Sequence, residues 1–320
     1  MMAKRPARVL VRVVMALHFA MAGPVVAQEL SPQERQCVER GWRAATVVAA
    51  DLNRRVLWRE PSGSWTRGAI AVLHGGGGRH FQFCVANVGF LEPQVAFTRL
   101  ALNSGFAVFL LDSSDRPRDN ENRPCGKVWD DEVRTRPNLD LPFIDRVAAQ
   151  LIPSVRPAGA NPALFIAGIS SGGFMTVRAA THFDDRFTAF AAVSAGDPYG
   201  WHRVCEKGMT RRTDVHGVGY DNETRQIVSQ PGACRAAAYP GERPWDRGSG
   251  RAKTTFRLFH HADDGILDVS CTEKLQTQLL RHGFAEEPAV RLSGGARGLA
   301  NHLWQDAYNT PLIEFFSRRR

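Results

Sequence analysis

The sequence predicts an α/β protein with a mostly parallel central sheet that helices cover on both faces. Apolar runs alternate with amphipathic segments along most of the chain. The apolar runs show no alternation with polar residues, as expected for strands that are buried on both faces. Strands that alternate with helices in this way are typical of a covered, mostly parallel sheet. Residues 28–320, about 290 residues, are enough for one large core, so we expect a single domain.

The N-terminal part of the pattern begins with a strand pair. Residues 46–60 predict two strands around a polar turn at Asn53. The apolar runs 68–76 and 105–113 predict buried strands, and the segment 92–104 between them has the apolar spacing of a helix.

The middle of the chain carries the clearest strand-to-helix transition. Residues 114–138 are polar and contain three prolines, which predicts a loop, and 140–152 has helical spacing. The run 163–170 predicts a strand that passes directly into a helix over 172–183, and 187–196 predicts the next strand.

The C-terminal part interrupts the alternation and then resumes it. Residues 197–253 are rich in glycine, proline, arginine and tryptophan. A strand is predicted over 254–262, a helix over 272–283, a strand over 289–295 and a closing helix over 311–319.

Several residues with chemical potential directly follow predicted strands. His74, Ser170 and the segment 260–264 each stand at such a position. The carboxyl ends of parallel strands meet at one edge of a sheet, where ligands bind in this class of fold. Residues 197–253 leave the sheet at the same edge, so we interpret them as a cap or lid over a site rather than as a second domain.

The serine pair at 170 and 171 lies within the pattern G-x-S-x-G. Gly168 and Gly172 flank Ser170, and small residues are required there because neighbouring backbone passes close to a sharp strand-to-helix corner. Centring the pattern on Ser171 would place the bulky Ile169 two residues before the corner. Ser170 is therefore the candidate nucleophile, and the amide of Ser171 at the helix start is a candidate donor to an oxyanion.

The glycine run "HGGGG" supplies a second candidate donor. Glycines after a strand let the backbone approach a substrate and present amide groups, and we choose Gly76 with Ser171 as the oxyanion hole. The run lacks the G-K-[ST] ending of a nucleotide-binding loop and the G-x-G-x-x-G spacing of a dinucleotide site. We therefore expect no nucleotide cofactor.

A serine hydroxyl needs a base, and the base needs an acid. On this kind of sheet the chain order is Ser, Asp, His. His302 follows the last predicted strand and is the candidate base, whereas His260 and His261 end a strand and are predicted to be structural. The residues alone leave three candidate acids after the penultimate strand: Asp263, Asp264 and Asp268.

The first 27 residues have the pattern of a secretory signal. Four basic residues precede an apolar run from Val13 to Ala22, and Val25 and Ala27 are small residues at the cleavage positions. The run is shorter than the roughly 20 residues that a membrane anchor needs. We expect a secreted or periplasmic protein of residues 28–320, with no stable membrane anchor. Removal of the signal lowers the formal charge from +9 to +5, and no basic cluster predicts nucleic-acid binding.

The cysteine content also favours an exported protein. All six cysteines lie after the predicted cleavage site, and an even number favours disulfides. Six cysteines allow 15 pairings. Cys205 with Cys234, and Cys84 with Cys125, are the pairs that would each close a loop-rich segment. No C-x-x-C motif is present, and no metal site is predicted.

With these residues in place, the chain resembles the α/β-hydrolase superfamily. The segment "LFIAGISSGGFMTVRAATHFDDRFTAFAAVSAGDPYG" is similar to secreted poly(3-hydroxybutyrate) depolymerases and feruloyl-esterase-like esterases, and "HLW" at 302–304 resembles the region around their catalytic histidine. In these proteins the acid usually stands four residues after the histidine of an H-G-x-x-D segment. The resemblance therefore implies Asp264, four residues after His260, as the acid.

The resemblance implies the α/β-hydrolase fold and a secreted serine esterase that uses no cofactor. Its substrate would be a small or polymeric ester, and Tyr199 and Trp201 would supply an aromatic wall for it; the alternative is that both rings are core of the cap. Two other functions are a serine peptidase on the same fold and a catalytically silent hydrolase-fold binding protein. The sequence does not indicate an oligomeric state.

Overall fold

The computed structural model describes residues 29–118, 122, 124–131, 136–183, 185–200, 220–221, 226–227, 229–235 and 254–319. The predicted signal peptide, Trp201, Cys205 and most of the predicted cap lie outside these described residues.

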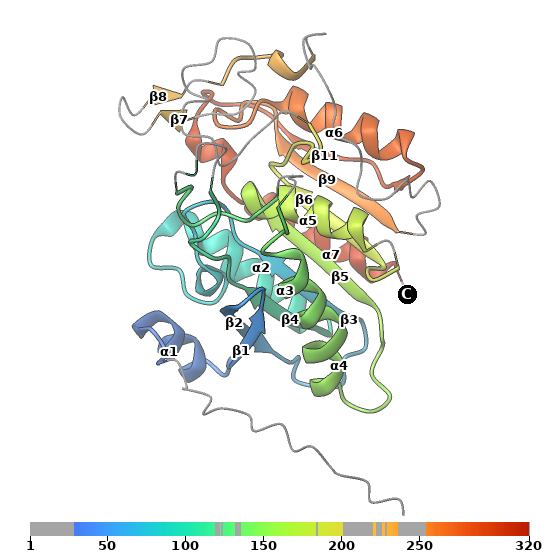
Figure 1. Cartoon of the computed structure of the whole chain (residues 1–320). Coiled ribbons are helices and arrows are strands. Elements are labelled where there is room, and N and C mark those ends of the chain that lie inside the picture. The colour runs from blue at the N-terminus through green and yellow to red at the C-terminus, as the bar shows by residue number, and fades with distance from the viewer. Residues whose placement is uncertain are drawn as a thin grey trace, which may run out of the picture.

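A nine-stranded sheet forms the centre of the described part of the chain (Figure 1). Its path is β1-β2-β4-β3-β5-β6-β9-β10, and β11 also pairs with β9. The pairings between β4, β3, β5, β6 and β9 are parallel, while β1 and β2 are antiparallel to their neighbours. A separate two-stranded sheet pairs β7 with β8. The strands are β1 (Arg43–Ala49), β2 (Leu52–Arg59), β3 (Gly68–Leu73), β4 (Phe106–Leu111), β5 (Leu164–Ile169), β6 (Ala189–Val193), β7 (Tyr220–Asp221), β8 (Gln226–Ile227), β9 (Thr255–His261), β10 (Ala285–Glu286) and β11 (Val290–Leu292).

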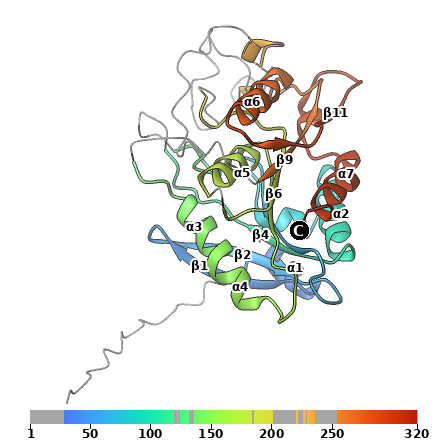
Figure 2. The ribbon, with the colours of Figure 1, turned by 90° about the vertical axis from the view of Figure 1, so that its right-hand side faces the viewer.

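Helices cover both faces of this sheet (Figure 2). The helices α3, α4, α5 and α6 lie on one side, and α2 and α7 lie on the other, where they pack against each other. The helices are α1 (Pro32–Glu39), α2 (Glu92–Asn103), α3 (Leu141–Arg146), α4 (Ile152–Val155), α5 (Ser171–His182), α6 (Val269–Arg281) and α7 (Asp306–Ser317); a π-helical turn, η3 (Val147–Leu151), joins α3 to α4. The short 3₁₀ helices are η1 (His80–Phe83), η2 (Gly89–Leu91), η5 (Ala233–Arg235) and η6 (Leu299–His302).

The central strands are apolar because both of their faces are covered. Every residue of β3, β4, β5 and β6 is buried. One core cluster includes Phe143, Phe174 and Leu275 from the helices on one face, and a second includes Phe97 and Phe316 from the other. The prediction of a mostly parallel sheet between two helical layers is therefore confirmed.

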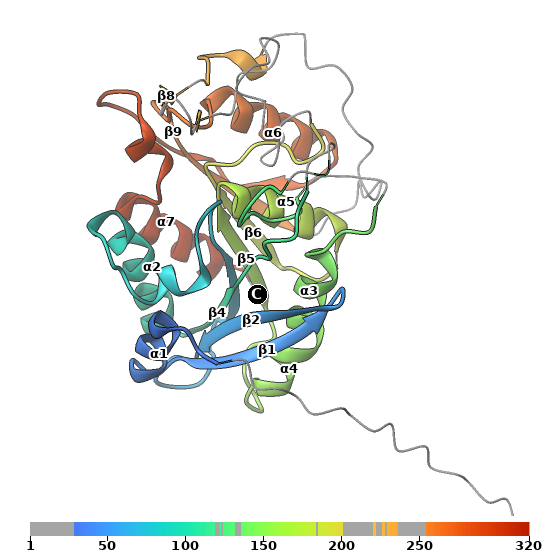
Figure 3. The same cartoon turned by 60° about the vertical axis from the view of Figure 1, so that its left-hand side comes forward.

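The N-terminal hairpin shows one difference from the sequence prediction. Its turn lies at Ala50 and Asp51 rather than at Asn53, which pairs with Val48 within the ladder. Both turn residues have positive φ, at 49° and 57°, as a two-residue turn of the type that matches strand twist requires. The hairpin extends the sheet at the end opposite β9 (Figure 3).

Two helix starts also differ from the prediction. Helix α6 begins at Val269 because the side chain of Asp268 accepts the amide of Ser270 and caps the helix. Helix α7 begins at Asp306 and contains Pro311, which the prediction had placed at the helix start.

Among the described residues, none of the helices combines the length and the apolarity that crossing a bilayer would require.

Candidate active site

Ser170 occupies the sharp corner between β5 and α5. Its backbone has φ 53° and ψ −124°, a region that non-glycine residues rarely adopt. Such a conformation costs on the order of 1–3 kcal/mol and persists only when the surroundings impose it. Here the Ser170 amide donates to the carbonyl of Val193 in β6 at 2.9 Å, and its carbonyl accepts the amide of Phe174 at 2.9 Å.

The two flanking glycines explain the G-x-S-x-G pattern in steric terms. A Cβ on Gly168 would lie 2.3 Å from the carbonyl oxygen of Gly172. A Cβ on Gly172 would lie 2.3 Å from the carbonyl oxygen of His74 and 2.5 Å from that of Leu73. Only glycine therefore lets α5 start this close to the end of β3.

The two neighbouring serines have different environments. Ser170 is partly exposed at the corner. Ser171 is fully buried, and its hydroxyl accepts the amide of Trp129 at 3.0 Å. The Ser171 hydroxyl is thus engaged in a structural hydrogen bond, which leaves Ser170 as the serine with an accessible side chain.

His302 and Asp264 are hydrogen bonded to each other. His302 Nδ1 lies 2.8 Å from Asp264 Oδ2, and the carboxylate is fully buried. A carboxylate can only accept, so Nδ1 carries the proton and Nε2 is left free to act as an acceptor. The other carboxylate oxygen, Oδ1, accepts the amides of Ile266 and Leu267 at 2.7 and 3.0 Å.

The electrostatics of Asp264 favour its charged form. Burial by itself raises the pKa of Asp264, but the interaction with His302 and the amide of Leu267 outweigh burial and lower it below its ordinary value. Asp264 is therefore a carboxylate at neutral pH, as an acceptor for the imidazole must be.

The other two candidate acids have different partners. The carboxylate of Asp263 accepts the amide of Gly294 at 2.9 Å, and Asp268 caps α6 and pairs with Arg297 at 3.2 Å. Among the three acids, Asp264 is the one that the structure brings to His302.

Backbone hydrogen bonds hold the segment around Asp264 against the segment that leads to His302. Asp264 forms an isolated parallel bridge with Gly298, four residues before His302. Gly265 donates its amide to the Gly298 carbonyl at 3.1 Å, and Gly298 donates to the Asp263 carbonyl at 3.2 Å. His302 ends the 3₁₀ helix η6 that follows this bridge.

A second imidazole, predicted to be structural, borders the acid. His260 is buried, with Nε2 3.0 Å from the Leu267 carbonyl and Nδ1 2.8 Å from the Thr272 hydroxyl. Its Nε2 is also 3.4 Å from Asp264 Oδ2. Burial lowers the pKa of His260 to about 4, so the ring is neutral at pH 7 and does not compete with His302 as a cation.

The sheet places Ser170 at the same edge as this pair. Strands β5, β6 and β9 are parallel neighbours, so the ends of β5 and β9 lie about 10 Å apart, at two interstrand spacings. Within the described residues, the Ser170 hydroxyl forms no hydrogen bond, so it is not joined directly to His302. The structure thus pairs the candidate base with the candidate acid and brings Ser170 to the same edge of the sheet.

The candidate oxyanion donors also lie at this edge. A Cβ on Gly76 would lie 3.8 Å from the Cβ of Ser171, so the two backbone segments are adjacent. No hydrogen bond among the described residues uses the amide of Gly76 or that of Ser171. Neither amide is therefore committed to a partner within the described residues.

The predicted aromatic wall is only partly within the described residues. Tyr199 is fully buried, and its hydroxyl lies 2.7 Å from that of Thr181 in α5. This position offers no exposed ring surface and favours the alternative interpretation, packing in the core. Trp201 lies outside the described residues.

The two disulfides that the structure describes correct both suggested pairs. Cys84 pairs with Cys37, not with Cys125, and Cys234 pairs with Cys271 of α6. The pairings depend on which loops the fold brings together, and spacing along the chain does not report this.

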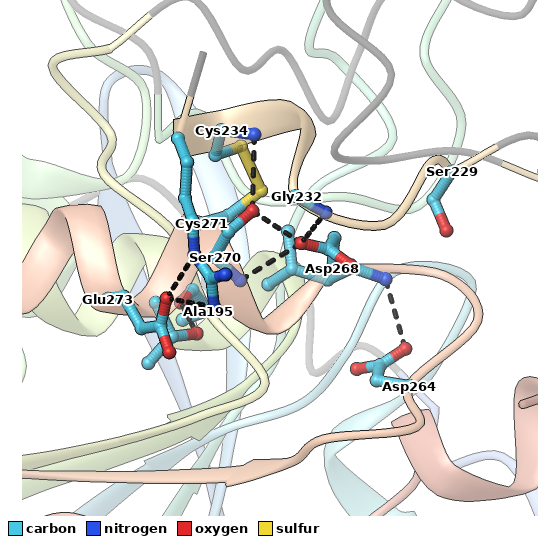
Figure 4. Close-up of a disulfide and its surroundings, with 12 residues drawn as sticks. Ala195, Ser229, Gly232, Cys234, Asp264, Asp268, Ser270, Cys271 and Glu273 are labelled. Atoms are coloured by element: carbon cyan, nitrogen blue, oxygen red, sulfur yellow. Dashed lines mark hydrogen bonds and ion pairs between the residues drawn. A yellow bond between two sulfur atoms is a disulfide. The ribbon is translucent and has the colours of Figure 1, made fainter.

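The Cys234–Cys271 disulfide fastens residues 229–235 to the first turn of α6, which follows the Asp264 segment (Figure 4). The amide of Gly232 donates to Asp268 at 2.9 Å, and the amide of Cys234 donates to the Ser270 hydroxyl at 3.1 Å. These contacts lie a few residues from Asp264, so this part of the predicted cap segment is attached beside the candidate acid.

Within the described part of the chain, no group of three or more histidine, cysteine or acidic residues is arranged as metal ligands.

Comparisons with known proteins identify the fold. No family model and no curated protein sequence matches this chain. Among solved structures, the chain is similar to FphF, a fluorophosphonate-binding serine hydrolase of Staphylococcus aureus, with 12% identity and a TM-score of 0.52 over 86% of this chain and 98% of that one. The chain has the α/β-hydrolase fold.

Two peptidase structures are similar over part of their length. The acylaminoacyl peptidase of Pyrococcus horikoshii gives 16% identity and a TM-score of 0.54 over 89% of this chain, and a puromycin-hydrolyzing peptidase of Mycobacterium tuberculosis gives 17% and 0.54 over 87%. This chain spans 44% and 40% of those two proteins. At these identities the similarity shows the α/β-hydrolase fold and no more.

Proposed function

We propose that this protein is a serine hydrolase that cleaves carboxylic esters through Ser170, His302 and Asp264. The observation that carries the proposal is the buried His302–Asp264 hydrogen bond at 2.8 Å, at the sheet edge where Ser170 has a strained backbone. A buried carboxylate that accepts a hydrogen bond from one imidazole nitrogen fixes the tautomer of the ring. It also stabilises the imidazolium that forms when the other nitrogen takes a proton.

The proposed reaction is acyl transfer to water. Ser170 Oγ attacks the ester carbonyl carbon while His302 Nε2 takes its proton, and Asp264 stabilises the imidazolium that forms. The amides of Gly76 and Ser171 donate to the negative oxygen of the tetrahedral intermediate. His302 then protonates the leaving alcohol, and a water molecule, activated by the same imidazole, hydrolyses the acyl-enzyme.

We place this esterase in the periplasm or outside the cell. The signal pattern of residues 1–27 supports this location, and so do the two described disulfides, because disulfides persist in oxidising compartments. The substrate class that we propose from the sequence resemblance is a hydroxyalkanoate or aryl ester, either small or polymeric.

The test is a matched panel of p-nitrophenyl esters and p-nitroanilides of the same acyl groups. We expect turnover of the esters, no turnover with Ser170→Ala, and measurable turnover with Ser171→Ala. Cleavage of the anilides at comparable kcat/KM would support a peptidase instead. No hydrolysis of either series, with no labelling by a fluorophosphonate, would support a silent binding protein and refute the proposal.

A further inference from the structure

Residues 127–129 contact both halves of the proposed oxyanion hole; we call them the 127–129 strap. The carbonyl of Lys127 accepts the amide of Gly77 at 2.7 Å, next to Gly76 in the glycine run. The amide of Trp129 donates to the hydroxyl of Ser171 at 3.0 Å. The strap therefore spans the two segments whose amides would bind the oxyanion.

Further contacts hold the 127–129 strap against the end of β3 and the glycine run. The indole of Trp129 donates to the carbonyl of His74 at 2.8 Å, at the end of β3. A Cβ on Gly76 would lie 3.4 Å from Val128 Cγ1, so this side chain is in van der Waals contact range of the glycine. A displacement of the strap would change the separation of Gly76 and Ser171.

The ammonium group of Lys127 anchors the strap to the end of β4. Lys127 Nζ donates to Asp112 Oδ2 at 2.6 Å and to the Ser113 carbonyl at 2.5 Å, and its side chain is only 10% exposed. Lysine is seldom buried to this extent unless it is paired. The cost of burying the charge is offset only while Asp112 is present and charged.

Asp112 is in turn held by His80, whose backbone amide donates to Oδ1 at 3.3 Å, and it is bordered by His74. Asp112 Oδ1 lies 3.1 Å from His80 Nδ1 and 3.3 Å from His74 Nε2. The amide of Ser113 donates to His74 Nε2 at 3.0 Å, so His74 carries its proton on Nδ1 and donates it to the Gly75 carbonyl at 2.7 Å. Burial lowers the pKa of His74, which is consistent with a neutral ring.

His80 supplies the positive charge on the other side of Asp112. Its Nε2 lies 3.2 Å from Glu34 Oε1, so both ring nitrogens face carboxylates, an environment that favours the protonated ring. Burial by itself lowers the pKa of His80, but the two carboxylates outweigh burial and raise it. Glu34 pairs with Arg55 at 3.0 Å. The charges thus alternate from Lys127 through Asp112, His80 and Glu34 to Arg55.

We propose that Lys127 is a positioning residue for the oxyanion hole, because its ion pair with Asp112 fixes the 127–129 strap and so the separation of the Gly76 and Ser171 amides. This inference depends on the proposed esterase function. Oxyanion donors act in the transition state more than in the ground state, so their displacement lowers kcat and leaves KM nearly unchanged.

The expected fall in kcat is bounded by the fall that follows removal of one oxyanion donor. Removing an oxyanion donor lowers kcat about 10²- to 10³-fold, and displacing donors without removing them should cost less, about 10- to 100-fold. A merely structural lysine would lower the amount of folded enzyme, which changes the active fraction and leaves kcat per active site unchanged.

The experiment compares Lys127→Met with Lys127→Arg and with Lys274→Met on α6, in the full mature chain. Active sites are counted by titration with a fluorophosphonate, and kcat and KM are then measured on a p-nitrophenyl ester. The affinity for an alkyl boronic acid, whose tetrahedral adduct resembles the intermediate, gives an independent readout. We expect a 10- to 100-fold lower kcat, KM within about twofold and weaker boronate binding for Lys127→Met, recovery with Lys127→Arg, and no change with Lys274→Met.

Different results would overturn the role of Lys127 and the esterase function. An unchanged kcat per active site in Lys127→Met, or a raised KM alone, would overturn the inference while the esterase function stands. If Lys127→Met does not fold, Lys127→Gln takes its place, and failure of both to fold would assign Lys127 to stability and overturn the inference. A wild-type enzyme without ester turnover or labelling would instead refute the proposed function.

Discussion

Replacing Gly172 with alanine tests the steric basis of the nucleophile corner. The added Cβ would lie 2.3 Å from the His74 carbonyl oxygen, whereas ordinary contacts begin at 3.4 Å. The end of β3 and the start of α5 must therefore separate by about 1 Å. Overpacking costs about 1–3 kcal/mol, and we expect the upper end because backbone rather than a side chain must move. A loss of about 3 kcal/mol lowers the folding equilibrium constant roughly 150-fold.

The same displacement should lower activity as well as stability. It moves Ser170 and the Ser171 amide relative to the glycine run, and a 1 Å misplacement of reacting groups can cost about 10²-fold in rate. Urea unfolding should show a lower midpoint at an unchanged slope, and ester hydrolysis per folded molecule should fall about 10²-fold.

Gly89→Ala is the matched control for this variant. A Cβ at Gly89 would meet no atom within 4 Å, so its unfolding midpoint and activity should stay close to those of the wild type. A Gly172→Ala enzyme with the wild-type midpoint and full activity would refute the steric argument.

Other variants test the acid, the N-terminal helix and a disulfide. Asp264→Asn should lower kcat on a p-nitrophenyl ester about 10³- to 10⁴-fold while the chain stays folded, because the amide would no longer fix the proton on His302 Nδ1; a loss under tenfold would contradict this role. Burial by itself raises the pKa of Glu34, but hydrogen bonds from its neighbours lower it from 4.5 to about 2. Glu34 should therefore stabilise the fold above pH 4.5, by up to about 3 kcal/mol, and this contribution should be lost as the pH falls toward 2. Urea unfolding of wild type and Glu34→Gln should differ at pH 7 and converge near pH 2; equal midpoints at pH 7 would contradict the ion pairing. The Cys234–Cys271 disulfide spans 37 residues, which corresponds to about 3–4 kcal/mol of chain entropy. The double serine variant at these cysteines should lose about this much stability in urea unfolding, and an unchanged midpoint would contradict the assigned pair.

The parts of the fold that the sequence predicts are those that local chemistry determines. The buried parallel strands are visible as continuous apolar runs because both faces of β3 and β5 are covered. The corner at Ser170 is visible because two backbone contacts exclude any side chain at Gly168 and Gly172. The early start of α6 also had a local signal that the prediction missed, the N-cap of Asp268.

The features that the sequence does not reveal join segments far apart in the chain. Cys37 and Cys84 are 47 residues apart and meet only because α1 packs near η1. Lys127, Asp112 and Glu34 come from three separate segments, and each alone is an ordinary charged residue. Their alternating charges and the 127–129 strap could be recognised only once the glycine run was placed against them.

The most direct test of the central claim is to locate a fluorophosphonate label by peptide mass mapping. The central claim is that Ser170 becomes a nucleophile because His302, held by Asp264, takes its proton. We expect one labelled peptide, modified at Ser170, with labelling lost in Ser170→Ala and strongly slowed in His302→Ala. Labelling at Ser171, or labelling of Ser170 at the same rate without His302, would contradict it.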